Sequence, residues 1–458
     1  MEVHFGMNIN EKLNICLMND SFPPVIDGVA NAVTNYAQVI NSELGSATVV
    51  TPAYPGAVDN YDFDVVRYKS INIEKICGYR AGYPFSSRNL ESLREKRFDI
   101  IHSHCPFAST LMARVLREKT EVPLVLTYHT KFDVDIRRAL PNELMVKQAI
   151  KLVVTNISAC DEVWTVSRGA GENLRSLGYQ GDYIVMENGV DFPCGRANDD
   201  FAAMLRDAYG ISQDAPLFLF VGRLMWYKGI RLILDALKLL SESDRSFRMM
   251  FVGDGADKAE IEEYAQELGL SDLCVFAGAI SDREELRVYY TAADLFLFPS
   301  EYDTNGIVVR EAAACGVGSL LIEGSCAAEG ITHGRTGILC KSDPQSIAEE
   351  LRFACAHRDE VRRIGAHAMD EVYISWETSV KRAYERYKVI KENVDNHVPT
   401  QRHESMLQEE FFSAMSSITD NIQRFRSINV GFREEMRDTR DKFKHIWHKI
   451  TGTLKKGD

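Results

Sequence analysis

Short apolar runs alternate with longer amphipathic stretches along the first 190 residues of the chain. Strands that are buried on both faces give such runs, and helices that cover a sheet give amphipathic stretches. The alternation therefore predicts βαβ units that build a parallel sheet with helices on both faces. The runs that we interpret as strands are Leu13–Met18, Ala47–Val50, Ile100–His102, Leu124–Thr127, Glu162–Val166 and Tyr183–Met186.

The same alternation restarts after a polar segment and predicts a second domain of the same kind. The segment, residues 190–213, contains Pro193, Gly195 and the pair Asp199-Asp200, so we interpret it as an irregular connection. The strands expected after it are Leu217–Val221, Arg248–Val252, Cys274–Ala277, Leu295–Pro299 and Gly318–Ile322, with helices such as Ile230–Leu240 and Ala259–Leu268 between them.

The predicted fold class is α/β, with two doubly wound, Rossmann-like domains in tandem. We place the first domain at residues 1–195 and the second at residues 212–375. Open parallel sheets bind ligands beyond the carboxyl ends of their strands. Two such sheets that face each other therefore predict a binding cleft between the domains.

A long amphipathic helical tail is expected at residues 399–458. Phe411, Ile418, Phe425 and Phe432 follow a seven-residue spacing, which makes a narrow apolar stripe. Several lysines flank aromatic and aliphatic residues near the end of the chain, as in helices that lie on anionic membranes. Three interpretations stay open: packing on its own subunit, oligomerisation, and membrane contact.

Composition and charge exclude several classes of protein. The 458 residues are 45% hydrophobic and 26% charged, which is the balance of a globular enzyme and not of a collagen, a coiled-coil rod or a disordered tail. Lysine and arginine number 53 and aspartate and glutamate 66, so the net charge is 53 − 66 = −13. Such a field disfavours nucleic acid as a partner.

The cysteines and the hydropathy pattern point to a cytoplasmic protein. The ten cysteines are scattered and form no C-x-x-C pair, so we expect reduced thiols without a disulfide framework or a zinc site. We find no signal peptide and no run of ~18 apolar residues that could span a membrane. A peripheral position at the inner membrane face is the alternative location.

Two cations follow the expected strand Leu217–Val221. Gly222 lets the backbone turn closely, and Arg223 and Lys228 come five residues apart before the next helix opens near Ile230. Arginine offers a planar fork for two oxygens and lysine a point charge, which suits a diphosphate. The alternative is a pair of solvated surface cations, but the end of a strand in a doubly wound domain favours a ligand role.

A second group of polar residues follows the apolar run that ends at Phe298. Asp303 and Glu311 are eight residues apart, with Asn305 and Gly306 in a turn between them. A helix that begins near Gly306 would direct free N–H groups and its positive end beyond the sheet. Glu311 could accept the hydroxyls of a ribose, as acidic residues do in dinucleotide sites. Alternatively, Asp303 caps the helix and Glu311 is a surface acid.

These residues together resemble glycosyltransferase family 4. The resemblance rests on G-R-L-x-x-x-K-G at residues 222–229, on Asp303-x7-Glu311 with the E-A-x-A-x-G pattern that ends at Gly316, and on N-terminal segments around Asp27-Gly28, residues 98–104 and His129. It covers residues 12–395. It implies the GT-B fold, with an acceptor-side domain, a nucleotide-sugar donor domain and a crossover helix at residues 376–398.

The resemblance also implies roles for single residues. Arg223 and Lys228 would hold the donor diphosphate, with Gly28 near its β-phosphate, and Glu311 would bind the ribose. Asp303 and the backbone of Asn305-Gly306 would bind the donor sugar, and His129 would lie beside the reacting centre. We therefore expect His129, Asp303, Arg223 and Lys228 to carry the chemistry.

The predicted activity is that of a retaining, metal-independent hexosyltransferase. It would move a sugar from a UDP- or GDP-sugar to a hydroxyl of a carbohydrate or lipid-linked acceptor, and no permanently bound cofactor is expected. Asp133-Val134-Asp135 resembles a metal motif of another fold, but we interpret it as a solvated loop. The alternative function is a catalytically silent homologue that stabilises another glycosyltransferase. A sugar-phosphate transferase or an epimerase on the same fold is a further possibility.

Overall fold

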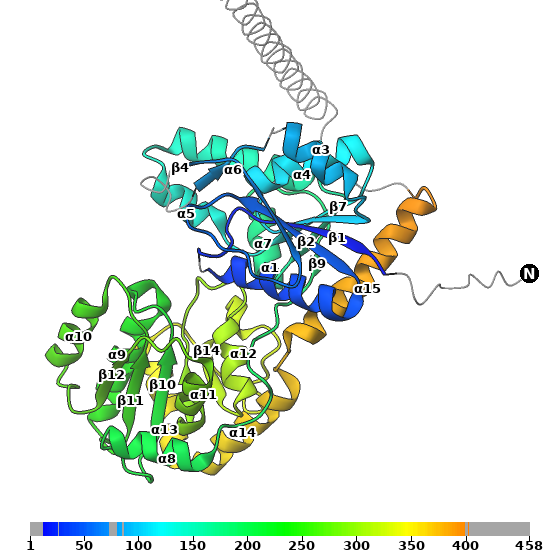
Figure 1. Cartoon of the computed structure of the whole chain (residues 1–458). Coiled ribbons are helices and arrows are strands. Elements are labelled where there is room, and N and C mark those ends of the chain that lie inside the picture. The colour runs from blue at the N-terminus through cyan, green and yellow to red at the C-terminus, as the bar shows by residue number, and fades with distance from the viewer. Residues whose placement is uncertain (1–11, 26, 73–79, 85–86, 399–401, 403–458) are drawn as a thin grey trace, which may run out of the picture.

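The computed structural model describes residues 12–25, 27–72, 80–84, 87–398 and 402. Two parallel sheets, each between layers of helices, form two lobes that lie one above the other in Figure 1. The predicted fold class is therefore confirmed for both sheets. The tail predicted at residues 399–458 lies outside the described residues, apart from Arg402.

The N-terminal sheet has seven parallel strands in the order β3-β2-β1-β6-β7-β8-β9. The strand order runs outward in both directions from β1, to β2 and β3 on one side and to β6 and the later strands on the other, which places a topological switch point between β1 and β6. The strands are β1 (Asn14–Met18), β2 (Ser46–Pro52), β3 (Asp64–Tyr68), β6 (Ile100–Ser103), β7 (Leu124–Tyr128), β8 (Glu162–Thr165) and β9 (Ile184–Val185). A small antiparallel hairpin, β4 (Ser70–Asn72) and β5 (Arg80–Gly82), lies outside this sheet and was not predicted.

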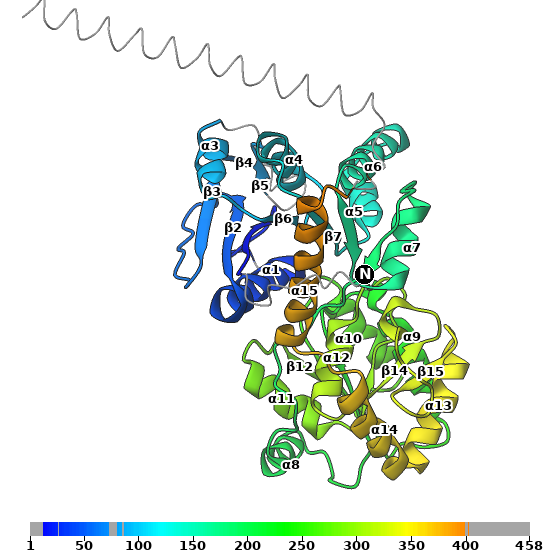
Figure 2. The same ribbon diagram turned by 90° about the vertical axis from the view of Figure 1, so that its right-hand side faces the viewer.

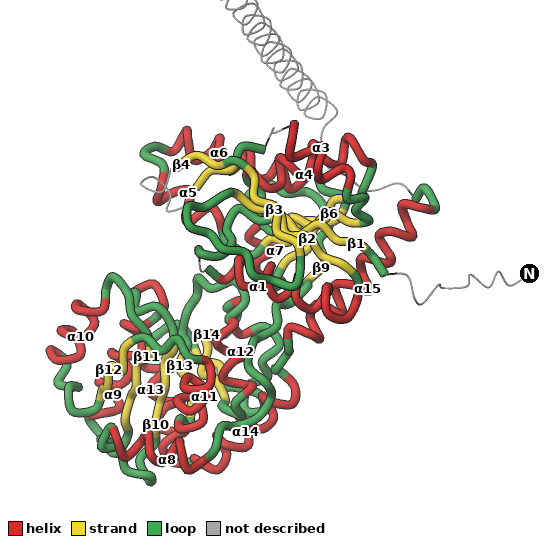
Figure 3. The backbone as a smooth tube through the Cα atoms, in the orientation of Figure 1, coloured by secondary structure: helices red, strands yellow, loops and turns green. Residues whose placement is uncertain are grey.

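Helices cover both faces of this sheet, as the tube drawing in Figure 3 shows. Those in the described part are α1 (Gly28–Val39), continued by the π-helical turn η1 (Ile40–Leu44), α3 (Ser87–Glu95), α4 (Ala108–Thr120), α5 (Phe132–Ala139), α6 (Glu143–Ser158) and α7 (Arg168–Ser176). Asp133 belongs to α5, so the solvated loop expected at residues 133–135 is wrong.

The C-terminal sheet has six parallel strands in the order β12-β11-β10-β13-β14-β15, with its switch point at β10. The strands are β10 (Leu217–Val221), β11 (Arg248–Val252), β12 (Cys274–Gly278), β13 (Leu295–Leu297), β14 (Gly318–Ile322) and β15 (Ile338–Cys340). The helices are α8 (Asp199–Ala208), η2 (Trp226–Lys228), α9 (Ile230–Ser241), α10 (Lys258–Glu267), α11 (Arg283–Ala292), α12 (Ile307–Ala314), η3 (Cys326–Ala328), α13 (Pro344–Ala356) and α14 (Arg358–Glu371).

The last described helix, α15 (Trp376–Asp395), returns to the N-terminal lobe and runs alongside both lobes in Figure 2. Its apolar face, including Val380 and Tyr387, is buried in the same core cluster as Ile15 of β1. The Tyr384 hydroxyl accepts a hydrogen bond of 2.7 Å from the Leu13 backbone N–H. The helix thus fastens the end of the described chain to the first strand.

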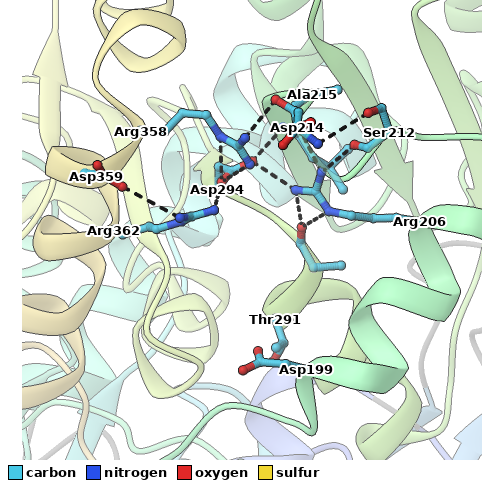
Figure 4. Close-up of polar contacts among 12 residues, drawn as sticks. Asp199, Arg206, Ser212, Asp214, Ala215, Thr291, Asp294, Arg358, Asp359 and Arg362 are labelled. Atoms are coloured by element: carbon cyan, nitrogen blue, oxygen red, sulfur yellow. Dashed lines mark hydrogen bonds and ion pairs between the residues drawn. The ribbon is translucent and has the colours of Figure 1, made fainter.

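The connection between the lobes contains helix α8, so the irregular segment expected at residues 190–213 is wrong for residues 199–208. Arg206 of α8 is buried and pairs with Asp294 at 2.9 Å, and Arg358 of α14 binds the same carboxylate at 2.9 Å (Figure 4). Asp294 also accepts the N–H of Leu217, the first residue of β10. Because Asp294 directly precedes β13, this cluster holds the amino-terminal edge of the sheet, away from the edge where such folds bind ligands.

Candidate functional site

The candidate site lies where loops leave neighbouring strands at the carboxyl edge of the C-terminal sheet. Strands β11, β10 and β13 are adjacent, and each ends in a loop that carries candidate residues. Gly253, after β11, lies so close to the loop after β10 that an added Cβ would come within 1.9 Å of the Gly222 carbonyl oxygen. The loops therefore pack backbone against backbone, which only glycine permits.

Lys228 and Asp303 meet at this edge. Lys228 ends the short helix η2, and its Nζ lies 2.5 Å from Oδ1 of Asp303 in the loop after β13. The Ser300 hydroxyl donates a hydrogen bond of 2.5 Å to the other carboxylate oxygen. The side chains of Lys228 and Asp303 are 13% and 20% exposed, so the charges are mostly but not completely shielded from water. The structure thus joins two predicted site residues that are 75 positions apart.

Gly229 fixes the turn that presents Lys228. Its φ is +80°, and an added Cβ would lie 2.1 Å from the Pro299 carbonyl oxygen. Gly229→Ala is therefore expected to destabilise the protein by about 3 kcal/mol or more, because the left-handed conformation costs about 1–2 kcal/mol and the overlap must also be relieved. Thermal unfolding measures the loss.

Gly210→Ala is the matched control for that substitution. Gly210 has a φ of +66°, but an added Cβ would meet nothing within 4 Å. Gly210→Ala should lower the free energy of unfolding only by the conformational cost, about 1–2 kcal/mol. Equal melting temperatures for the two variants would show that the approach to Pro299 does not matter.

Asn305 and Gly306 form the entrance to helix α12. Gly306 adopts the left-handed conformation, with φ +59°, and is the N-cap residue, so the helix begins one residue later than Gly306 itself. The Asn305 side chain is buried, and within the described structure its Nδ2 has no hydrogen-bond partner. A buried amide without a partner is costly, so this group is available to a ligand.

Glu311, on α12, is 4% exposed, and both of its carboxylate oxygens are already bound. Arg283 donates to one oxygen at 2.9 Å, and the Tyr290 hydroxyl donates to the other at 3.0 Å. Burial raises the pKa of Glu311 above its usual value, and the charge of Arg283 opposes that rise. Glu311 is therefore a held and oriented carboxylate, not the surface acid of the alternative interpretation.

Arg223 differs from the other predicted residues. It lies two residues beyond β10, is exposed, and has no ion-pair partner among the described residues. An exposed, unpaired guanidinium at a strand end can bind an oxyanion at little desolvation cost. The structure places Arg223 at the expected edge but does not bring it to Lys228 through any shared contact.

His129 follows β7 in the other lobe and belongs to a row of buried imidazoles. Its Nε2 lies 2.9 Å from Nδ1 of His104, and the His104 ring lies 4.0 Å from the His102 ring. Burial lowers the pKa of His129 to about 3. The ring is therefore neutral at physiological pH and acts as a hydrogen-bond partner, not as a cation.

The two lobes touch beside His129 and Asp303. The Thr304 hydroxyl donates a hydrogen bond of 2.7 Å to the His129 carbonyl oxygen, and Nζ of Lys131 lies 3.5 Å from the Glu301 carbonyl oxygen. The loop that carries His129 therefore contacts the loop that carries Asp303, and candidate residues from both lobes share one region.

Gly28 begins helix α1 in the N-terminal lobe. The Asp27 carboxylate caps this helix by accepting from the N–H groups of Val29 and Ala30, at 2.9 and 2.7 Å. An added Cβ at Gly28 would meet nothing within 4 Å. The space beside Gly28 is open, as an approaching ligand would require.

Metal ligands and disulfides were not expected in this chain. Among the described residues, no group of three or more His, Cys, Asp or Glu side chains is placed to hold a metal ion. The nine cysteines in that part of the chain are free thiols.

Two residues that shape the site, Arg283 and Tyr290, were not predicted from the sequence, and a third, His104, was named only within the segment 98–104 of the family resemblance. Arg283 and Tyr290 hold Glu311, and His104 holds His129. His104 could have been assigned to the site, because it directly follows the neighbouring strand β6 and lies at the same sheet edge as His129. Arg283 gives no signal in the sequence, since it is one exposed arginine among many.

Two family models match the chain. The model described as Glycosyltransferase Family 4 matches residues 26–192, and the model described as Glycosyl transferases group 1 matches residues 203–370. The chain belongs to glycosyltransferase family 4. The first match covers most of the N-terminal lobe and the second most of the C-terminal lobe of this glycosyltransferase.

Curated relatives of this family 4 glycosyltransferase include lipid-modifying enzymes. The chain is 24% identical over 309 residues to alpha-monoglucosyldiacylglycerol synthase of Streptococcus pneumoniae, covering 66% of this chain and 70% of the relative. It is 25% identical over 340 residues to a GDP-mannose-dependent alpha-mannosyltransferase of Corynebacterium glutamicum, covering 73% and 78%.

Among solved structures, Anabaena HepE in complex with UDP matches with a TM-score of 0.66 and 18% identity, covering 82% of this chain and all of that chain (100%). Sucrose-phosphate synthase from Thermosynechococcus elongatus matches with a TM-score of 0.66 and 20% identity, covering 83% and 99%. At these identities the likeness shows the fold, which is GT-B.

Proposed function

We propose that the protein moves a hexose from a nucleoside-diphosphate sugar to an acceptor hydroxyl, with retained configuration and without a metal ion. The observation that carries the proposal is the partly shielded Lys228–Asp303 pair, 2.5 Å apart, at the carboxyl edge of a doubly wound sheet. An ammonium group and a carboxylate at one point suit a ligand that presents both phosphate oxygens and sugar hydroxyls.

The proposed chemistry is electrostatic. Breaking the anomeric bond leaves negative charge on the departing nucleoside diphosphate. Lys228, which Asp303 holds, and the free N–H groups at the start of α12 can stabilise that charge without rearrangement, and the exposed Arg223 would add a second cation. These fixed positive groups are the basis for proposing that no metal ion is needed.

The remaining assignments follow the contacts. Glu311 would accept the ribose hydroxyls, Asp303 with Asn305 and Gly306 would bind the donor sugar, and open space at Gly28 would receive the β-phosphate. His129 would bind the sugar as a neutral imidazole, since its pKa is about 3. Both UDP- and GDP-sugars are proposed as donors. The similar structure of HepE is a complex with UDP, and the relative of Corynebacterium glutamicum is named as GDP-mannose-dependent.

We propose a lipid-linked acceptor first and a soluble carbohydrate second. Two relatives, of Streptococcus pneumoniae and of Acholeplasma laidlawii, are named as alpha-monoglucosyldiacylglycerol synthases, after a glycolipid. In this proposal residues 1–195 receive the acceptor, residues 212–375 bind the donor, and residues 376–398 join them. The protein would be cytoplasmic and in peripheral contact with the inner membrane face, where it would meet such an acceptor. Residues 399–458 would assist this contact or oligomerisation.

A screen of UDP- and GDP-sugars tests this function. Purified protein is incubated with each donor and a cell lipid extract, and released nucleotide and glycosylated products are measured by mass spectrometry. We expect release with at least one donor, accompanied by a lipid that has gained the mass of one hexose. Absence of release with every donor, together with stable association with another glycosyltransferase, would favour the silent-homologue alternative.

A further inference from the structure

Helix α6 exposes an apolar and basic face on the acceptor-side lobe. Leu144, Met145 and Leu152 are 69%, 46% and 52% exposed, and Lys147 and Lys151 beside them are also exposed. The opposite face, which includes Val146 and Val153, packs into the lobe's core. The helix therefore exposes large apolar side chains to water, although it already packs against the core through its other face.

The charge of this face is unlike that of the whole chain. The protein carries 66 acidic residues and a net charge of −13, yet residues 144–158 contain two lysines and no acidic residue. Glu143, at the start of α6, is paired with Arg137 at 2.9 Å. The exposed face of α6 is therefore locally positive.

We propose that α6 docks this enzyme on an anionic lipid bilayer, with the three apolar side chains entering the interface and the two lysines contacting lipid phosphates. Helices with an apolar side and flanking lysines bind anionic membranes in this way. A second copy of the chain fits less well, since a symmetric contact would bring the same lysines together.

The position of α6 suits delivery of a membrane acceptor. Helix α5 begins three residues after His129, and α5 packs on α6. Lys131, between His129 and α5, contacts the Glu301 backbone of the donor loop. Docking through α6 would thus place the bilayer next to the segment that leads to the reacting centre. None of the helices in the described part of the chain has the length and apolar character to cross a membrane.

The docking face has a matched control at the far end of the molecule. Helix α8 lies at the opposite end from α6 in Figures 1 and 2 and exposes Phe201 and Met204 by 56% and 64%. Its neighbouring charges are acidic, from Asp199, Asp200 and Asp207. It therefore offers similar apolar exposure without the positive charge.

Fluorescence quenching tests the inference in the full-length protein. Leu152→Trp and Met204→Trp are each mixed with vesicles of phosphatidylglycerol and brominated phosphatidylcholine. We expect Leu152→Trp to show more quenching than the parent protein, and Met204→Trp to show no more than the parent protein. Addition of Lys147→Glu and Lys151→Glu should weaken vesicle partitioning by about thirtyfold or more, because two lysine charges are lost and two carboxylates that anionic lipid repels are added.

Equal extra quenching for Leu152→Trp and Met204→Trp, or none for either, would overturn the inference. A dimer in the absence of lipid, detected by light scattering and dissociated by Leu152→Trp, would also overturn it. So would carbodiimide crosslinks from Lys147 or Lys151 to residues 403–458 that persist when vesicles are present. The inference extends the lipid-linked acceptor of the proposed function. Vesicle binding is measured without turnover, and nucleotide release in solution is measured separately, so either can fail alone.

Discussion

Replacing Lys228 by alanine is expected to reduce sugar transfer by about a hundred- to a thousandfold, the usual cost of removing one fixed group that stabilises charge in the transition state. The ammonium lies 2.5 Å from Asp303 and is the most shielded cation at this sheet edge among the predicted residues. Without this ammonium group the negative diphosphate has no cation beside it, and the carboxylate of Asp303 repels the diphosphate. Steady-state kinetics with the donor found in the screen measures the loss.

Lys238→Ala separates this effect from a general loss of lysine. Lys238 lies on α9, is 44% exposed and pairs with Glu242 at 3.9 Å, a surface contact of little value. Its variant should keep full activity, and both variants should melt within a few degrees of the parent protein. Near-normal transfer by Lys228→Ala would remove the central support of the proposed mechanism.

The strands could be predicted because they are buried on both faces. Leu217–Val221 was expected as a strand and is β10, since every residue in it packs against helices and must be apolar. The hairpin of β4 and β5 could not be predicted, because strands of three residues leave no recognisable run. Helix α8 was missed for another reason: its buried face includes Arg206, whose charge hides the apolar period.

The sheet edge of the candidate site could be predicted, but its pairings could not. Residues that follow parallel strands collect at one edge, which brings Lys228 and Asp303 near each other from sequence alone. Whether the two side chains meet depends on the turn at Gly229 and on Ser300. Gly229 ends the G-R-L-x-x-x-K-G pattern, but that spacing does not say which carboxylate Lys228 meets. Glu311 shows the limit most clearly, since its partner Arg283 is 28 positions away.

Arg283 links the proposed ribose site to the other lobe. Its guanidinium reaches Glu311 at 2.9 Å and Asp191 of the interlobe connection at 3.2 Å, and it lies over the Phe192 ring at 5.2 Å. Asn31 of α1 donates to the same oxygen of Asp191 at 3.1 Å. A carboxylate assigned to the donor is thus joined through two ion pairs and one hydrogen bond to the helix that begins at Gly28.

Arg283→Met is expected to make donor binding depend strongly on pH. Burial and the nearby Asp191 raise the pKa of Glu311, while Arg283 and the Tyr290 hydroxyl lower it. Without Arg283 the pKa rises further, so a larger fraction of Glu311 is protonated at a given pH and accepts ribose hydroxyls poorly. The donor KM should rise about tenfold at neutral pH, and the defect should shrink as the pH increases.

The pH profile distinguishes this role from a purely structural one. In Glu311→Gln the donor KM should be high at every pH. Adding Arg283→Met to this variant should not make the donor KM depend on pH, because the titrating carboxyl of Glu311 is gone. Arg245→Met is the control, since Arg245 is 47% exposed and pairs with Asp272 at 2.7 Å away from these residues. A profile for Arg283→Met that matches the parent protein would show that Arg283 does not hold Glu311 ionised for the donor.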